Sequence, residues 1–506
     1  MAIEFSHELD TIRSTVNGQS NRQERLNIGQ FLTPVRIARF MASLFEQEKQ
    51  DVRILDAGAG AGVLFTSLLE TILNRNGSLR SIKIIAYEND KNILAYLHQA
   101  MTRCEMLCGH AGILFKWDIR NEDFIQAAIH QTETGFFTEQ QERFTHAILN
   151  PPYKKINSET TTRHLLNSAG IEVSNYYAAF VWLAAQMLEP NGEMVAITPR
   201  SFCNGPYFRK FRINFLKMMS LNHIHIFESR KNAFGDDDVL QENVIYHAVR
   251  RSNKPDHIIL SSSDGLNFDE VNNKTVPYKY IVNPDDHDAF IRLLITDTDE
   301  LVMKRMDCFT TSLTKLGLEV STGRVVDFRA QEYLRALPEK DTVPLIYPCH
   351  FENGFIHWPT NSGKKPNAII STDETRSLLI EPGYYVLTRR FSAKEERRRI
   401  VAAVFDPNVI KASLLGFENH LNYFHEKGKG LPPELAKGLC LYLNSTLVDQ
   451  YFRLFSGHTQ VNATDLRKLR YPTCEQLLRL GSHIQDQIPD QQTIDALVEK
   501  ECCNND

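Results

Sequence analysis

The chain lacks the features of a membrane protein, a secreted protein or a metalloprotein. None of its 506 residues lie in an apolar run of membrane-spanning length, and Met1 to Asp10 do not form a signal peptide. The nine cysteines show no metal-ligand spacing, because the closest separated pair, Cys104 and Cys108, has no second pair or histidine cluster with it. These absences predict a reduced, cytoplasmic protein without a bound metal.

A strong net charge is also absent. The formal charge is -5, and the 42% hydrophobic and 24% charged residues are ordinary for a globular chain. Residues 301–506 are close to neutral, with 26 Lys/Arg and 25 Asp/Glu, so the rest of the chain is the acidic part. This difference makes the second half the better candidate to meet a polyanion. The length predicts two to three domains.

The first half alternates short apolar runs with amphipathic stretches. Thr33 is predicted to cap a helix that begins at Pro34. Further helices are predicted after the glycine-rich turn and over 176–188. The predicted strands are 52–55, 82–87, 113–117, 145–149, 194–198, 221–227 and 243–249. Such alternation indicates a doubly wound, mostly parallel α/β sheet.

The most informative sequence is Asn150-Pro151-Pro152-Tyr153, directly after the strand 145–149. Open α/β sheets bind ligands at the carboxyl ends of their strands. Two prolines remove two backbone donors and fix two φ angles, which leaves a rigid turn that presents an amide, bare carbonyls and an aromatic ring. Asn150 Oδ1 and the Pro151 carbonyl can both accept from one exocyclic amino group, and Tyr153 can stack on its ring. A strand-ending turn with a surface tyrosine is the alternative.

A glycine-rich turn carries the second signal. Gly58, Gly60 and Gly62 follow the first strand and open a helix, so the backbone there can approach a ligand closely. The spacing is G-x-G-x-G, which argues against the pyrophosphate site of dinucleotide-binding proteins.

Acidic residues stand at the ends of the neighbouring strands. Asp56 precedes the glycine turn, Glu88 follows the second strand, and Asp118 is predicted to end the third. A carboxylate after the second strand is well placed for ribose hydroxyls. Each acid alone is more often a solvated residue, but three at successive strand ends favour a shared binding crevice.

These motifs together resemble the gamma-class adenine-N6 DNA methyltransferases of type II restriction–modification systems, in particular the PstI/BsuBI type. The family's acid-x-Gly-x-Gly turn is matched by Asp56 to Gly60, and its catalytic motif by Asn150 to Tyr153. Its N-terminal Gly-Gln-Phe-x-Thr-Pro motif is matched by Gly29 to Pro34. Many members have Pro after the first acid, where this chain has Ala57.

The resemblance implies a fold, a cofactor and a set of site residues. The fold is a seven-stranded-type S-adenosylmethionine-dependent methyltransferase sheet followed by a mixed α+β target-recognition domain. The implied catalytic residues are Asn150, Pro151, Pro152, Tyr153 and Phe234, the last as a second stacking aromatic or else a packed loop residue. The implied S-adenosylmethionine-binding residues are Gly29, Phe31, Thr33, Pro34, Asp56, Gly58, Gly60, Glu88, Asn89, Asp118, Ile119 and Asn150.

The second half contains basic clusters that can contact DNA phosphates or read guanine. The predicted DNA-binding residues are Lys364, Lys365, Arg389, Arg390, Arg397 and Arg398. Glu395 and Glu396 interrupt the densest run, so a solvated charged surface is the alternative. The segment 417–424 mixes polar and aromatic residues that also suit a DNA groove.

The sequence therefore predicts a DNA adenine-N6 methyltransferase. Residues 1–265 are expected to bind S-adenosylmethionine and transfer the methyl group, and residues 266–506 to recognise a short duplex site, which the resemblance suggests is CTGCAG. The expected partners are double-stranded DNA and, functionally, a restriction endonuclease. Two alternatives remain: a protein-glutamine or RNA methyltransferase, and a non-catalytic DNA-binding specificity protein. The sequence does not predict the oligomeric state.

Overall fold

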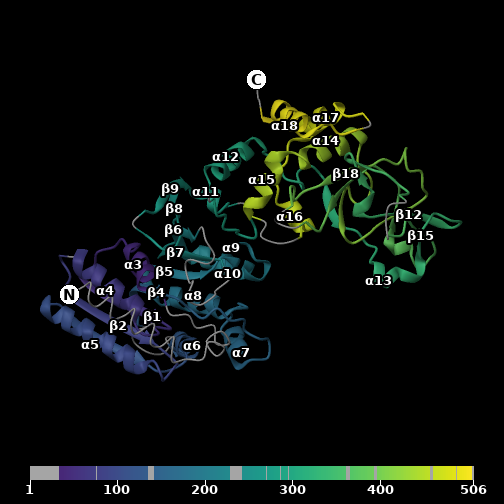
Figure 1. Ribbon diagram of the computed structural model, residues 1–506. Helices are drawn as coiled ribbons and strands as arrows, with labels where there is room; N and C mark the ends of the chain where they lie inside the picture. Colours follow the sequence, from purple (N-terminus) through teal and green to yellow (C-terminus); the bar gives the residue numbers. More distant parts are fainter. Residues whose placement is uncertain are drawn as a thin grey trace. The chain divides into compact units, whose positions relative to one another are not determined.

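The chain folds into two compact units, residues 1–295 and 296–506, which Figure 1 shows in ribbon form. The computed structural model describes residues 33–75, 77–134, 142–227, 242–268, 270–284, 286–294, 296–360, 365–392, 396–455, 460–485 and 487–503. The first unit runs past the predicted domain boundary at residue 265, because a further strand pairs with the sheet after that point. Within these residues, no helix is long and apolar enough to span a membrane.

The first unit is built on one large sheet. Its strands are β1 (Asp51–Ala57), β2 (Ser81–Tyr87), β3 (Leu114–Arg120), β4 (Phe144–Leu149), β5 (Leu188–Pro199), β6 (Met219–Phe227), β7 (Asn243–Arg250), β8 (His257–Ser263) and β9 (Asn272–Pro277). Among the described residues the sheet order is β3-β2-β1-β4-β5-β7-β6-β8-β9, nine strands where the resemblance implies seven. The strands from β3 to β5 are all parallel, and β7 runs antiparallel to both of its neighbours.

Helices cover both faces of this sheet, so the fold is α/β (Figure 1). The helices are α3 (Val35–Ser43), α4 (Val63–Arg75), α5 (Leu94–His110), α6 (Phe124–Thr134), α7 (Thr161–Ser168), α8 (Tyr176–Met187), α9 (Ser201–Asn204), α10 (Arg209–Met218) and α11 (Tyr278–Ile281). One layer is α3, α4 and α5, and the other contains α6, α8 and α10. Both α4 and α8 contact β1 and β4, which leaves these central strands buried on two sides.

The parallel strands at the centre of the sheet could be predicted from the sequence because both of their faces are covered. A strand covered on both faces has few positions for polar side chains, so it becomes a continuous apolar run. β4 is buried along its whole length. Because β1, β2, β3, β4 and β5 are parallel, their carboxyl ends share one edge of the sheet.

The second unit contains two smaller sheets. Among the described residues their orders are β10-β20-β17-β18-β14-β13 and β11-β15-β12-β19-β16. The strands are β10 (Glu319–Thr322), β11 (Leu334–Arg335), β12 (Thr342–Ile346), β13 (Phe351–Glu352), β14 (Phe355–Ile356), β15 (Ala368–Ile370), β16 (Leu379–Ile380), β17 (Tyr385–Arg389), β18 (Ala402–Phe405), β19 (Leu415–Phe417) and β20 (Leu421–His425). Their helices are α12 (Asp297–Arg305), α13 (Asp327–Ala330), α14 (Pro433–Leu443), α15 (Thr446–Phe455), α16 (Ala463–Arg467), α17 (Cys474–Ser482) and α18 (Gln491–Val498).

Two features of this unit were not expected. Helices α14 and α17 cross so closely that a Cβ added at Gly438 would lie 1.8 Å from the Leu477 carbonyl oxygen. A Cβ at Gly481 would lie equally close to the Glu434 oxygen. Cys308 and Cys503 form a disulfide, in contrast to the expectation of fully reduced cysteines.

Candidate active site

The Asn-Pro-Pro-Tyr turn begins at the residue after β4, at the shared carboxyl edge of the parallel strands. Asn150 is partly exposed, Pro151 is buried, and Pro152 and Tyr153 are intermediate. The Tyr153 hydroxyl donates to Asn150 Oδ1 at 3.0 Å, and it lies 3.4 Å from the Ile197 carbonyl oxygen of β5. Burial raises the pKa of Tyr153, so the hydroxyl keeps its proton. The turn thus holds the amide and the phenol in one hydrogen-bonded unit.

Thr33 is joined to this turn across 117 residues of sequence. Asn150 Nδ2 donates to Thr33 Oγ1 at 2.9 Å. Thr33 therefore does not cap α3 with its side chain; the helix begins at Val35, and Pro34 occupies the capping position without a side-chain hydrogen bond. The predicted cap was wrong by one residue, because the helix begins at Val35 and Thr33 lies one position before the capping residue. Two of the predicted site motifs nevertheless meet at this contact.

The glycine-rich turn follows β1 and packs against the end of β2. Gly58 has φ +82°, a conformation that side chains with a Cβ rarely adopt. The backbone N–H groups of Gly58 and Ala59 both donate to the Tyr87 carbonyl at 2.9 Å. A Cβ at Gly58 would reach ordinary contact with the Phe180 ring of α8, at 3.6 Å. Backbone hydrogen bonds therefore hold the first two residues of the turn against the end of β2.

Glu88 fixes the third residue of the turn. Its carboxylate accepts from the Gly60 N–H and from the Asp90 N–H, each at 2.8 Å. Burial raises the pKa of Glu88, and these two amides oppose the rise. Asn89, beside it, is exposed. A buried carboxylate aligned by backbone donors keeps lone pairs for hydroxyl groups of a ligand.

Asp56 is fully buried at the end of β1. Neither of its carboxylate oxygens makes a hydrogen bond of normal geometry with a described residue. Burial raises the pKa of Asp56 well above its usual value, the Phe65 amide opposes this rise, and nearby Glu88 adds to it. A buried carboxyl without partners carries a large desolvation cost and is a common feature of binding sites.

Asp118 does not lie where the sequence placed it. β3 continues to Arg120, so Asp118 stands two residues before the end of the strand, opposite Ile85. Its carboxylate is about half exposed and pairs with Arg120 at 2.8 Å. Ile119 packs against the hydrophobic core. The predicted strand end was too early because β3 lies at the edge of the sheet, where its burial alternates and its sequence is less apolar.

Asn121 occupies the position expected for Asp118. It follows β3 directly, and its Nδ2 donates to the Glu88 carbonyl at 2.7 Å. Its position directly after the strand could have identified Asn121, but the predicted strand ended at residue 117. Phe180, beneath Gly58, was also missed, because a phenylalanine in an apolar helix carries no local sign of its neighbour.

Some predicted residues lie outside the described part of the chain. They are Gly29, Phe31, Phe234 and Lys364.

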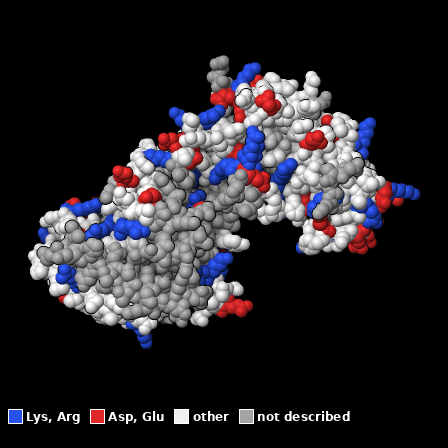
Figure 2. All heavy atoms as spheres, viewed as in Figure 1, with Lys and Arg blue, Asp and Glu red and all other residues white. Residues whose placement is uncertain are grey.

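The predicted DNA-binding residues differ in their surroundings. Arg397 is exposed, whereas Arg398 donates to the Ser445 carbonyl at 3.1 Å and also contacts Gln491. Arg390 donates to the Asn419 carbonyl at 3.2 Å. On the face seen in Figure 2, described Lys and Arg side chains are interspersed with Asp and Glu, without one continuous basic surface. Arg398 thus makes its hydrogen bonds inside the second unit, and its role in DNA binding stays a prediction.

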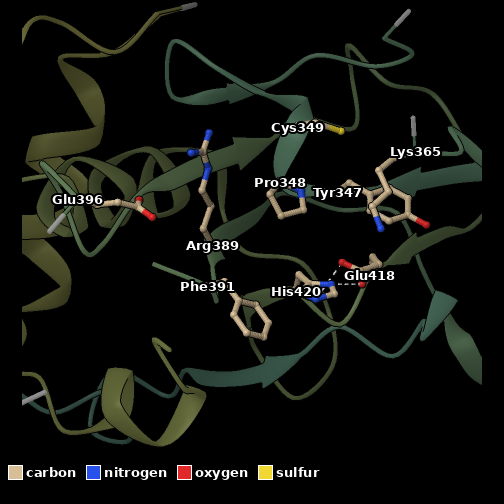
Figure 3. Close-up of a pocket in the computed structure, with 9 residues that line it drawn as sticks. All are labelled: Tyr347, Pro348, Cys349, Lys365, Arg389, Phe391, Glu396, Glu418 and His420. Atoms are coloured by element: carbon tan, nitrogen blue, oxygen red, sulfur yellow. Dashed lines mark hydrogen bonds and ion pairs between the residues drawn. The ribbon is translucent and has the colours of Figure 1, made fainter. Parts of the chain in front are cut away.

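Lys365 and Arg389 line a pocket of about 390 Å³ in the second unit, together with aromatic and acidic side chains (Figure 3). Lys365 Nζ donates to Asp327 at 2.7 Å and lies 5.2 Å from the centre of the Tyr347 ring. The Arg389 guanidinium lies 5.5 Å from the centre of the Phe351 ring. Two of the six predicted residues therefore share one concave site.

Comparison with known proteins places the chain in a family. Residues 67–234 match the family model described as Eco57I restriction-modification methylase. The chain is 42% identical to the type II methyltransferase M.PstI of Providencia stuartii, over 97% of this chain and 96% of that protein. It is also 42% identical to the type II methyltransferase M.BsuBI of Bacillus subtilis, over 98% of each. Among solved structures it is similar to the type IIG restriction endonuclease BpuSI, with a TM-score of 0.44, 13% identity, and coverage of 95% of this chain and 64% of that one. The chain therefore belongs to the type II methyltransferases of restriction–modification systems.

Proposed function

We propose that this enzyme transfers a methyl group from S-adenosylmethionine to N6 of an adenine in duplex DNA. The observation that carries the proposal is the contact of Thr33, Asn150 and Tyr153 at the carboxyl end of β4, next to the glycine turn of β1. An amide and an aromatic ring that bind an amino-bearing base thus stand at the same sheet edge as a cradle for the methyl donor.

The residues at the end of β1 and β2 fit S-adenosylmethionine. The buried, unpartnered Asp56 and the positive-φ backbone at Gly58 leave a polar group and an open peptide edge for a ligand. Glu88 is aligned to accept from ribose hydroxyls. When bound, the cofactor supplies an electrophilic methyl group. Gly29, Phe31, Pro34, Gly60, Asn89, Asp118 and Ile119 complete the proposed set, with Asp118 the least favoured by its position.

The turn supplies the groups that the adenine amino group needs. Its lone pair is delocalised into the ring, so N6 is a poor nucleophile. Acceptors at Asn150 Oδ1 and the Pro151 carbonyl would draw both N–H bonds and stabilise the positive charge that develops during transfer. Asn150 Oδ1 is oriented by the hydrogen bond that it accepts from the Tyr153 hydroxyl. Tyr153, Pro152 and Phe234 would hold the ring, which must leave the duplex to enter the site.

We further propose that the second unit binds DNA through Lys364, Lys365, Arg389, Arg390 and Arg397. The resemblance of the motifs to the PstI/BsuBI type suggests a short site of the CTGCAG type. The likeness to type II methyltransferases supports the pairing of the enzyme with an endonuclease against which it protects DNA.

The test is transfer of labelled methyl from S-adenosylmethionine to unmethylated duplex DNA that contains CTGCAG, followed by nucleoside analysis. Label in N6-methyladenine is the expected result. Label in N4-methylcytosine would refute the base assignment. Label absent from DNA but present in RNA or in protein glutamine would replace the substrate, and no transfer at all would indicate a specificity protein.

A second test separates catalysis from cofactor binding. Asn150→Ala removes the acceptor and should abolish transfer while leaving S-adenosylmethionine affinity within a few-fold of wild type. Loss of cofactor binding, measured by calorimetry, would show that Asn150 serves the cofactor and not the amino group.

A further inference from the structure

The pocket of the second unit contains three side chains that are each held in place by a neighbour (Figure 3). Lys365 is paired with Asp327 and lies over the Tyr347 ring. Arg389 lies over the Phe351 ring. The His420 ring is held by Glu418. Prearranged polar groups in a concave site are typical of specific recognition.

Glu418 has no exposed surface, yet it partners an exposed residue. Its carboxylate accepts from the His420 backbone N–H at 2.9 Å and contacts His420 Nδ1. The His420 side chain is 43% exposed. Burying a carboxylate is costly, and here it fixes the orientation of a surface ring. With Nδ1 engaged by Glu418, Nε2 is the ring nitrogen that faces a ligand, and it donates to a base acceptor when the ring is an imidazolium paired with the Glu418 carboxylate.

Arg389 has unused hydrogen-bonding capacity. Among the described residues its guanidinium makes no hydrogen bond or ion pair; Nε is buried, and the group lies over the Phe351 ring. The N–H fork of arginine matches the O6 and N7 acceptors of guanine in the major groove. Phe391, which is 48% exposed and stacks near His420 at 4.8 Å between ring centres, adds an apolar wall.

The charge balance of the pocket disfavours a phosphate. Lys365 is already paired with Asp327, and the Glu418 carboxylate lies in the lining with Arg389. A site without net positive charge does not attract an anion, whereas a neutral base with acceptor atoms gains hydrogen bonds there.

We propose that Arg389 and His420 read a guanine of the DNA recognition site from this pocket, with Glu418 as the positioning residue of His420. This inference rests on the proposed function, because it requires duplex DNA as the substrate. It assigns base recognition to the loop between β19 and β20 and to the end of β17, and it adds two residues to the specificity determinants.

The experiment measures binding of the full chain to labelled CTGCAG duplexes by fluorescence anisotropy. In parallel duplexes each guanine is replaced in turn by 7-deazaguanine, which lacks the N7 acceptor. The wild type should bind one replaced duplex about tenfold or more weakly, the size of one bidentate base contact. Arg389→Ala should bind native and replaced duplexes equally, and Arg389→Lys, which keeps the charge but loses the fork, should behave in the same way.

His420→Ala and Glu418→Gln should reduce the same discrimination ratio by a smaller factor. Arg397→Ala is the matched control: this exposed arginine outside the pocket should weaken binding to every duplex without a change in the ratio. If the Arg389 variants keep the wild-type ratio and instead flatten the salt dependence, the pocket binds phosphate and the inference is overturned.

Failure of the proposed function gives a different result. If wild type transfers no label to DNA but discriminates between the duplexes through Arg389, the recognition pocket stands and the catalytic proposal falls. If wild type methylates adenine while all pocket variants keep full discrimination, only the recognition pocket is refuted. If the wild type neither binds nor methylates DNA, both are refuted.

Discussion

The hydroxyl and the ring of Tyr153 have separable roles, and two substitutions test them. Tyr153→Phe removes the donor to Asn150 Oδ1 but keeps the ring. The contact at 3.0 Å counts as one hydrogen bond, and the 3.4 Å approach to the Ile197 carbonyl adds little. One such bond contributes about 1 kcal/mol net, so transfer should slow about fivefold. Tyr153→Ala also removes the stacking surface, for which about 1–3 kcal/mol is typical, and should slow transfer by a further factor of about five or more.

The assay is single-turnover methyl transfer with saturating DNA and cofactor, so that product release does not mask the chemical step. Cofactor affinity, measured separately, should be the same for both variants and the wild type. Equal losses for Tyr153→Phe and Tyr153→Ala would mean that the hydroxyl, not the ring, is the essential group. Wild-type rates for Tyr153→Ala would refute a role for this residue in holding the base.

Further predictions concern the buried carboxyl, the helix crossing and the basic cluster. Because burial raises the pKa of Asp56, the folded protein should lose stability as pH rises through that raised value. Asp56→Asn should raise Tm at pH 8 and abolish this pH dependence of stability in calorimetry. The same substitution should weaken cofactor binding. Gly438→Ala should lower the free energy of unfolding by about 1–3 kcal/mol, since α17 leaves no space, whereas Gly77→Ala, with nothing within 4 Å, should be neutral in a urea titration. Arg397→Ala should flatten the salt dependence of DNA binding, and Arg398→Ala should instead lower Tm, because its guanidinium serves packing. An unchanged slope for Arg397→Ala would return that residue to the solvated surface.

The central strands of the first unit could be predicted because strands buried on both faces are continuous apolar runs in the sequence. β2 and β4 differ from the predicted runs by a single residue each at one end. The predicted edge strand β3 ended too early. Asp118 was therefore expected directly after the strand, a position that Asn121 occupies. The extension by β8 and β9 was missed because the three serines that end β8 and the polar residues 272–275 of β9 resemble loops in composition.

The site itself was predictable only as separate motifs. The sequence could indicate that Asn150 and Thr33 mattered, but not that the Asn150 amide donates to the Thr33 hydroxyl. In the second unit, neighbouring arginines that look alike in the sequence have different surroundings in the structure. Arg397 is exposed while Arg398 is tied to Ser445, because neighbouring residues in an irregular segment point in different directions.

The link between the glycine turn and β2 has a consequence for the order of events in catalysis. Gly58, Ala59 and Gly60 are already tied to Tyr87 and Glu88 before any ligand arrives. A cradle assembled in advance loses little further backbone entropy on association. The methyl donor and its demethylated product should therefore exchange at a preformed site. Turnover on long DNA then does not require the turn to refold between successive sites.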